Sequence, residues 1–274
     1  CFNQIKGFGE YGFPESHAAS FALLAYASAY FKCHYLPAFL CALLNNQPMG
    51  FYHPAVLIKD AQRHGLRVLP ADVNISDWDC TVEGEKHDLR LGLRYVRGLR
   101  AVAGQAVAER KPFKDVDDLA HRVPELNKDE LEKLAGAGAL ASLETAHRRD
   151  ALWKAGRAGR PSGPLLEMVP ENSPEAPLGP MTIEERLEAD YNGLGLTVGP
   201  HPVHYLRERL NRMGCTPAAG LIGKRNGSAV RVAGNVIVRQ RPGTAKGILF
   251  ISLEDETGIS NIVVMPDLFA EQRL

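Results

Sequence analysis

Apolar residues in the first third of the chain recur at helical spacing and are interrupted by proline, glycine and asparagine. The pattern predicts a helix from about 17 to 34, a second from Pro37 to 44, and a third over 54–66. Ser16 is suited to cap the first of these, because a serine there can accept a hydrogen bond from the first turn. Phe, Tyr and Trp are concentrated here, with 12 of the 20 in residues 1–52, which predicts a densely packed region.

The next region combines a short β pattern with helices. Residues 67–73 indicate a short extended run, and residues 88–96 alternate between apolar and charged positions, as a half-buried strand does. Helices are predicted from about 102 to 110, from near Asp115, and over 128–134. The last of these helices leads into a segment of small residues that contains Gly136 and Gly138.

The character of the sequence then changes twice. Residues 155–182 hold six Pro and four Gly, which is typical of a linker. After a helix expected around 203–213, three runs of β pattern follow at 230–239, 248–253 and 261–265, with a turn at 255–258 and a helix at 268–273. The chain is therefore expected to be an α+β, multidomain protein that is mainly helical first and β at its end.

The formal net charge is zero, with 32 Lys and Arg against 32 Asp and Glu, but the charge is unevenly distributed. Residues 86–114 carry eight basic and two acidic side chains, and residues 223–247 carry six basic and none acidic, so each stretch has a net charge of +6. Residues 171–190, between them, have a net charge of −5. For either basic stretch alone, an ordinary solvent-exposed charged surface explains the charge as well as phosphate binding does. Because there are two such stretches, each on an element interrupted by glycine, phosphate binding is favoured.

Two segments have the form of a glycine turn that opens into a helix. The first is Val96 to Arg100 and the second is Ala135 to Ala139. Such a turn directs backbone N–H groups outward at a positive helix N-terminus, where a phosphate can bind. Together they indicate a tandem helix-hairpin-helix unit that grips a duplex backbone without reading its sequence, although each alone can be an ordinary glycine-terminated helix. The predicted DNA contacts are Arg97, Gly98, Arg100, Gly136 and Gly138.

The β region presents a second candidate surface. Its first two strands are joined by a basic segment, Arg239 to Gly247, and an aromatic residue follows on the second strand. Basic residues and an aromatic on a small curved sheet suit single-stranded nucleic acid in an OB-fold, and the alternative is simply a basic hairpin loop. An OB-fold has five strands, so with three expected strands this one is predicted to be partial. The predicted contacts are Arg231, Arg239, Arg241, Lys246 and Phe250.

We identify no catalytic constellation and no metal site in the sequence. The acidic run Asp115 to Asp118 starts a predicted helix, where carboxylates favour the positive end, so helix capping is favoured over metal ligation. His201 and His204 have no third ligand at a recognisable spacing. The five cysteines include no Cys-x-x-Cys pair, which indicates a reducing, cytoplasmic compartment. No signal peptide is recognisable, the apolar stretch 18–31 is too short to span a bilayer, and the first residues suggest a cut through a longer protein.

Several longer motifs resemble those of a known family. The run Gly7-Phe8-Gly9-Glu10-Tyr11-Gly12-Phe13-Pro14-Glu15-Ser16-His17-Ala18-Ala19-Ser20-Phe21 is similar to the fingers region of bacterial family C replicative polymerases, the DNA polymerase III alpha subunits. Pro14-Glu15, Asn45 to Tyr52 and Arg239 to Ala245 resemble the error-prone paralogue used in damage-induced mutagenesis. The resemblance covers essentially the whole chain. The first glycine turn departs from the usual form of the family's hairpin, because Arg100 stands where a second glycine is common.

The resemblance implies a division into four parts: the late part of the polymerase fingers (1–84), the tandem helix-hairpin-helix domain (85–154), a linker with a helix (155–222), and a partial OB-fold (223–274). It also implies that the catalytic aspartates and their Mg²⁺ lie in an upstream palm domain. This part is therefore expected to be inactive alone and to hold no cofactor. Ser16, His17 and Lys32 are the residues expected near the incoming nucleotide.

The implied function is template-directed DNA synthesis past lesions, in which this part binds template-primer and single-stranded DNA. The implied partners are deoxynucleoside triphosphates in the full-length enzyme and mutagenesis proteins, with the sliding clamp only indirectly and no membrane. The alternative is a non-catalytic DNA-binding or protein-docking module of a mutagenesis complex.

Overall fold

The computed structural model describes residues 15–50, 52–158 and 176–272. Its first three helices are α2 (Glu15–His34), α3 (Leu36–Asn45) and α4 (Pro54–Arg63), which confirms the helical pattern of this region. Ser16 lies inside α2, so the prediction that it caps the helix is wrong. A proline occupies the first turn of α3 and of α4, where its missing N–H costs nothing.

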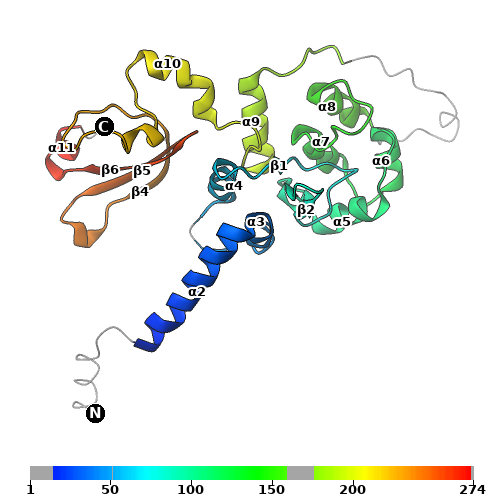
Figure 1. Cartoon of the computed structure of the whole chain (residues 1–274). Coiled ribbons are helices and arrows are strands. Elements are labelled where there is room, and N and C mark those ends of the chain that lie inside the picture. The colour runs from blue at the N-terminus through cyan, green and yellow to red at the C-terminus, as the bar shows by residue number, and fades with distance from the viewer. Residues whose placement is uncertain (1–14, 51, 159–175, 273–274) are drawn as a thin grey trace, which may run out of the picture.

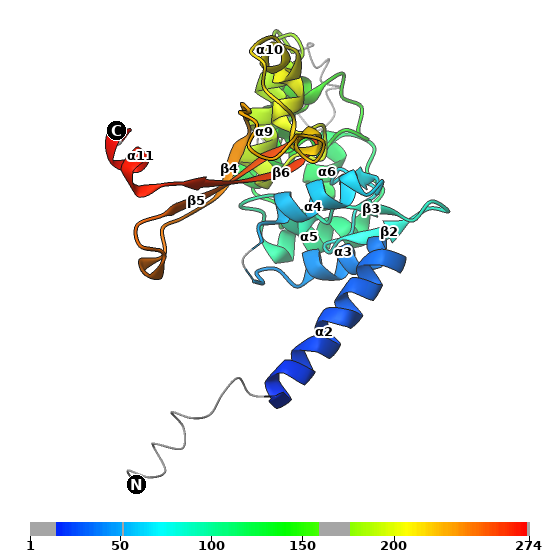
Figure 2. The ribbon, with the colours of Figure 1, turned by 60° about the vertical axis from the view of Figure 1, so that its left-hand side comes forward.

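Helix α2 projects from the rest of the molecule (Figure 2). Its apolar side chains are open to solvent, with 57% of Phe21, 70% of Leu23 and 73% of Tyr26 exposed. The expectation of a densely packed aromatic region is therefore wrong for this helix. Composition indicates that apolar side chains are present, but what covers them depends on which surfaces the fold brings alongside.

A small sheet follows α4. Strands β1 (Val68–Leu69), β2 (Thr81–Glu83) and β3 (Asp88–Arg90) have the order β1-β3-β2, with β1 parallel and β2 antiparallel to β3. The strand predicted over 88–96 therefore ends at Arg90 and gives way to the short helix η1 (Leu93–Tyr95). It ends because the N–H groups of Leu93 and Arg94 bond to the carbonyls of Asp77 and Trp78, which belong to a loop rather than a strand.

The hairpin region contains α5 (Ala101–Arg110), α6 (Val116–Arg122), α7 (Lys128–Gly136) and α8 (Arg148–Arg157). The predictions of α5, α6 and α7 are confirmed, and the Asp115 side chain caps α6 by accepting from the N–H of Asp118 at 2.8 Å. Helix α8 was not predicted, and it continues past the expected domain end at residue 154.

The second glycine turn ends α7 and does not lead directly into a helix. Gly138 has φ of +80°, its N–H bonds to the carbonyl of Ala135, and the N–H of Ala139 bonds to that of Leu134. This is the Schellman arrangement, in which a left-handed glycine satisfies the last carbonyls of a helix. Gly136 is the last residue of α7, and a Cβ added there would lie 3.8 Å from the side chain of Leu152.

A buried carboxylate joins the first glycine turn to α7. Glu130 is 1% exposed and accepts four hydrogen bonds, from the Arg100 backbone N–H, Nε and Nη2 at 2.9 Å each and from the Asn127 N–H at 3.0 Å. Asn127 in turn accepts from the N–H of Glu130, which completes a capping box. Hydrogen bonds from the Arg100 guanidinium lower the pKa of Glu130 to about 2.

Residues 159–175 of the predicted linker lie outside the described ranges. The next helices are α9 (Ile183–Leu194), η2 (Pro202–Leu206), α10 (Arg207–Arg212) and η3 (Ala218–Leu221). The helix expected around 203–213 is present as η2 and α10. Helix α9 was not predicted, although Thr182 and Glu185 form a capping box at its start, which is a recognisable sequence signal.

The last part is a second sheet. It contains three antiparallel strands in the order β4-β5-β6: β4 (Asn235–Gln240), β5 (Leu249–Asp255) and β6 (Gly258–Val264). The short helix η4 (Gly243–Ala245) lies between β4 and β5, and α11 (Pro266–Glu271) follows β6. The three predicted strands are confirmed, but the first begins at Asn235 rather than Val230. Before it, Arg231 makes only an isolated bridge to Cys215.

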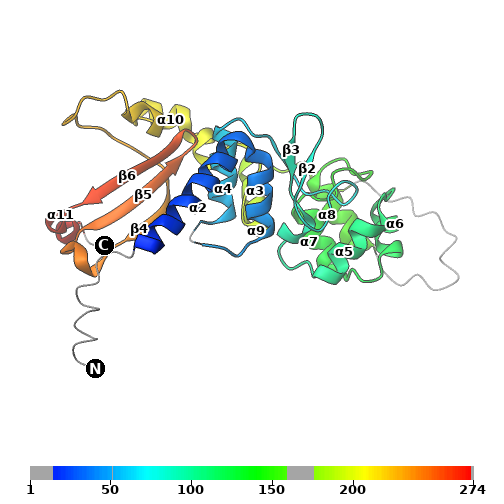
Figure 3. The same cartoon turned by 60° about the horizontal axis from the view of Figure 1, so that its bottom comes forward.

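The two candidate DNA-binding regions lie at opposite ends of the molecule, with α3, α4 and α9 between them (Figures 1 and 3). One continuous apolar core runs from Leu40 to Leu196 and contains no residue of β4, β5 or β6. The sheet is therefore attached to the helices rather than built into their core.

We expect Glu130→Gln to remove a pH-dependent part of the stability. Because the folded state lowers the Glu130 pKa from 4.5 to about 2, this stabilisation is complete above pH 4.5 and is lost as the pH falls toward 2. At about 1.4 kcal/mol per pKa unit it amounts to about 3 kcal/mol of unfolding free energy at neutral pH.

Urea unfolding at pH 7 and at pH 3 measures this, with Glu132→Gln on the exposed side of α7 as the control. The stability difference between the protein and Glu130→Gln should shrink as the pH is lowered. A difference that stays constant would contradict the assignment.

Two substitutions in one turn should have opposite effects on thermal stability. Gly138→Ala forces a left-handed alanine whose Cβ would lie 2.5 Å from Arg148 Nη2, so the melting temperature should fall, for a cost of about 1–2 kcal/mol. Gly136→Ala places a Cβ at 3.8 Å from Leu152 in a helical position and should be neutral or stabilising by up to about 1 kcal/mol. Equal effects of the two changes would refute the capping role of Gly138.

Candidate nucleic-acid interface

The first glycine turn leads directly into a helix N-terminus, where the N–H of Arg100 is bonded to Glu130 and the first turn beyond it has no capping side chain from the N-cap residue. Gly98 has φ of +80°, and α5 begins three residues later with Arg100 as its N-cap, which makes no side-chain capping hydrogen bond. Val102, in the first turn of α5, is 66% exposed. Backbone N–H groups at such a terminus carry a partial positive charge and suit a phosphate oxygen.

A lysine that the sequence analysis did not single out lies over this turn. A Cβ placed on Gly98 would be 2.6 Å from Lys133 Nζ, so the ammonium group of α7 covers the turn. Its ion pair with Asp129, one turn earlier on α7, is exposed. Lys133 was missed because it belongs in sequence to the second motif, and only the fold brings it to the first.

The two arginines of the first turn are already engaged. Arg97 is exposed, but its N–H bonds to the carbonyl of Gly193 at 2.8 Å and its Nη1 to the carbonyl of Tyr191 at 3.0 Å, at the end of α9. Arg100 is held by Glu130, which balances its charge. Both remain predicted DNA contacts, and in this structure each also has a structural role.

The second glycine turn is closed by internal partners. The side chain of Arg148 lies against Gly138 and pairs with Asp190 of α9 at 2.8 Å. Beyond the turn, the N–H and hydroxyl of Ser142 both bond to Asp72, which is 5% exposed, at 3.0 and 2.6 Å. Internal carboxylates thus hold Ser142 and Arg148, two of the donors beside this turn.

The sheet has one face suited to stacking. Gln240, Phe250 and Val263 are paired across the three strands and therefore share a face. Phe250 is 39% exposed and Val263 is 55% exposed. In the next row on this face, Ser252 donates to Asn261 Oδ1 at 2.8 Å. The result is an exposed aromatic ring among small and polar side chains.

The basic residues predicted for the sheet are not gathered on this face. Arg239 pairs with Ile251 and so lies on the opposite face from Phe250, because neighbouring residues of a strand alternate. Arg241 folds back onto α11, with its guanidinium carbon 4.7 Å from the centre of the Phe269 ring. Arg231 donates to the carbonyl of Met213 at 2.6 Å, and Lys246 is exposed at the end of η4.

The three residues expected near a nucleotide are not brought together. Ser16 and His17 lie at the outer end of α2, where the His17 ring packs against Phe21 with centroids 4.4 Å apart. Lys32 is at the other end, roughly 22 Å away at 1.5 Å per helical residue, and pairs with Asp60 of α4 at 2.7 Å. Their role at a nucleotide stays a prediction.

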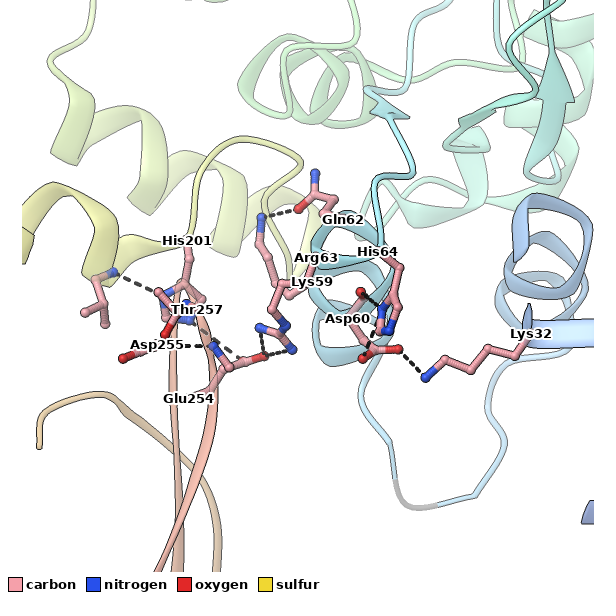
Figure 4. A network of polar contacts seen from close by, with 12 residues as sticks. Lys32, Lys59, Asp60, Gln62, Arg63, His64, His201, Glu254, Asp255 and Thr257 are labelled. Atoms are coloured by element: carbon pink, nitrogen blue, oxygen red, sulfur yellow. Dashed lines mark hydrogen bonds and ion pairs between the residues drawn. The ribbon is translucent and has the colours of Figure 1, made fainter. Parts of the chain in front are cut away.

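The structure also reveals a polar joint between α4 and the tip of the β5–β6 hairpin, drawn in Figure 4. Arg63 of α4 bonds to Glu254 of β5, and His201 lies 3.8 Å from the same carboxylate. From the sequence, residues 255–258 are expected only to form a turn. The three consecutive acidic residues 254–256 beside that turn were the sequence signal that could have indicated a polar contact there.

Neither a metal site nor a membrane span was found where the structure can be described. Residues 15–50, 52–158 and 176–272 contain no group of three or more His, Cys, Asp and Glu side chains that could hold a metal ion. No helix in those ranges is both long and apolar enough to cross a membrane.

Comparison with known proteins places this geometry in a family. A family model described as a helix-hairpin-helix motif matches residues 65–151, which include both glycine turns. The error-prone DNA polymerase of Alkalilimnicola ehrlichii is 51% identical over 280 residues, covering 99% of this chain and 27% of the relative. That of Ralstonia nicotianae is 48% identical over 281 residues, covering 98% and 26%. That of Methylococcus capsulatus is 48% identical over 297 residues, covering 99% and 28%.

The chain thus spans about a quarter of the length of the curated relatives it matches. The similarity extends over all the elements described above, from α2 to α11, and agrees with the resemblance that the sequence motifs indicate. With a matched helix-hairpin-helix region and about half of its residues identical to those relatives, the chain belongs to the error-prone DNA polymerase family.

Proposed function

We propose that this chain holds primed DNA for an error-prone DNA polymerase, with its first glycine turn on the duplex and its C-terminal sheet on the single strand. The observation that carries the proposal is the N-terminus of α5 beneath the ammonium group of Lys133. A helix N-terminus and a nearby lysine bind a phosphate without reading bases, as a polymerase that must follow any sequence requires. The family match supports this assignment.

The two turns contribute unequally in this proposal. The second turn, with Gly136 and Gly138, supports the first rather than binding a phosphate, because Arg148 and Asp72 already occupy its surroundings. Arg97 and Arg100 shape the first turn through Tyr191 and Glu130, and Arg97, whose partners are carbonyl oxygens, also adds positive charge beside it.

The sheet β4-β5-β6 is, in this proposal, the first part of an OB-fold. Its exposed Phe250 suits stacking with an unpaired base, and Arg239, Lys246, Arg241 and Arg231 supply positive charge around it. The order of three antiparallel strands and the exposed aromatic support the assignment.

The activity of the whole enzyme belongs to the proposal as well. It is nucleotidyl transfer past lesions, with deoxynucleoside triphosphates and Mg²⁺ bound by residues of the longer protein, in the cytoplasm, together with mutagenesis proteins. This chain alone is predicted to be inactive, and its own contribution is to bind and orient DNA.

Lys133→Ala should weaken duplex binding several-fold and reduce the slope of log affinity against log salt by about one. Fluorescence anisotropy with a labelled duplex over a salt series measures both. Lys128→Ala is the matched control, because Lys128 is also a lysine of α7 with an i,i+4 acidic neighbour but does not cover Gly98. Equal effects of the two changes would overturn the role of Lys133. If the unaltered protein binds no DNA at low salt, a protein-docking module becomes the better explanation.

Phe250→Ala should lower affinity for a single-stranded oligonucleotide by about tenfold, the equivalent of one lost base stack, and leave duplex affinity unchanged. Val263→Ala, its neighbour on the same face, is the control for loss of apolar surface. A loss shared equally by single-stranded and duplex DNA would count against the stacking role.

A further inference from the structure

The joint between α4 and the β5–β6 hairpin consists of buried, directional polar contacts. Arg63 Nη1 and Nη2 both lie 3.0 Å from Glu254 Oε1, and the two side chains are 18% and 6% exposed (Figure 4). His201, 5% exposed, has its Nε2 at 3.8 Å from the other oxygen of Glu254. A buried pair of this kind is little screened by salt and fixes geometry more than it adds stability.

The next two acids of the hairpin tip hold the segment that leads into the sheet. Asp255 Oδ2 accepts from the Ala218 N–H at 2.8 Å and from Arg207 Nη2 at 3.0 Å, and Glu256 pairs with the same arginine. Burial raises the pKa of Asp255, but hydrogen bonds from Thr257 and Ala218 outweigh this effect, so the pKa of the carboxyl lies below its ordinary value. The tip therefore moves as one unit with α10 and η3.

Helix α4 also holds the chain on its way to that unit. Lys59 Nζ donates to the carbonyl of Gly199, and Gln62 Nε2 donates to that of Val198 at 2.8 Å. Because residues 59, 62 and 63 are spaced three and four apart, they share one side of α4. Burial lowers the pKa of Lys59 to about 8, which reflects how closely the joint is packed.

Apolar packing contributes little to this attachment. The continuous core of the described helices ends at Leu196 and includes no residue of the sheet. At the joint the sheet contributes Ile259, which borders an apolar hollow of about 420 Å³ beside α3 and α4 and is itself 43% exposed. The orientation of the sheet thus depends on polar contacts, above all on Arg63 and Glu254.

We propose that the Arg63–Glu254 pair is the positioning element that fixes the sheet relative to the glycine turns, so that a junction between duplex and single-stranded DNA is bound at both ends of the molecule at once. The inference rests on the proposed function, and it adds the pair of residues that makes the duplex contact and the single-strand contact reinforce one another. When two surfaces are held in a fixed relation, the second contact becomes intramolecular, and affinity for the junction exceeds that for either part. If the joint loosens, that gain falls because the effective concentration of the second surface falls.

The test compares three labelled ligands by anisotropy: a duplex, a single strand, and a junction that joins them. In Glu254→Gln and in Arg63→Gln, the extra affinity for the junction should fall about tenfold, while affinity for the duplex and for the single strand stays unchanged. The double variant Arg63→Gln with Glu254→Gln removes both charges of the pair together and should show the same selective loss. Small-angle scattering of the same variants should show a broader distribution of intramolecular distances.

Glu185→Gln is the matched control, because it weakens another cross-helix pair, with Arg149 at 2.6 Å, inside the helical part and away from the joint. It should leave the junction preference intact. Unchanged junction preference in all three joint variants would overturn the inference while leaving the proposed function standing. If the unaltered protein binds neither duplex nor single strand, it is the proposed function that fails. If a single variant loses its main thermal transition, it is no longer folded, and the double variant takes its place in the comparison.

Discussion

The arrangement of the first glycine turn depends on one buried carboxylate. Glu130 accepts hydrogen bonds from the backbone and the guanidinium of Arg100 and from the start of its own helix. Because all these donors converge on one side chain, the start of α5, the start of α7 and the turn between η1 and α5 have fixed relative positions. The same contact neutralises Arg100, which leaves Lys133 as the cation lying over Gly98. A structural contact of the fold thus decides which of these two solvent-accessible cations has a buried carboxylate as its partner.

Two turns that look alike in sequence have different surroundings. The first leads into an exposed helix N-terminus, whereas the second is a Schellman cap enclosed by Arg148 and Asp72. Helix α9 contributes to both, through Tyr191 and Gly193 at the first turn and Asp190 at the second. Part of the region 155–222, which the sequence predicts to be a linker with a helix, therefore belongs to the framework of the hairpin region.

Much of the fold could be predicted from local sequence. Helices α3, α5 and α7 and the three strands of the last sheet follow apolar periodicity, and Asp115 caps α6 as its position indicated. Two helices, α8 and α9, were missed although α9 has a capping box at Thr182. The candidate site was predicted less well: Arg239 and Phe250 occupy opposite faces because a bulge shifts the register between Val236 and Val238.

What the sequence determined by itself was the family, the kinds of element and the positions of the glycine turns, because motifs, periodicity and turn chemistry act over a few neighbouring residues. Tertiary structure alone decided that Lys133 covers Gly98, that Asp72 holds Ser142 beyond the second turn, and that Glu254 meets Arg63. These pairs lie between 35 and 191 positions apart. Their contacts depend on how whole elements pack, and no local pattern of residues encodes that geometry.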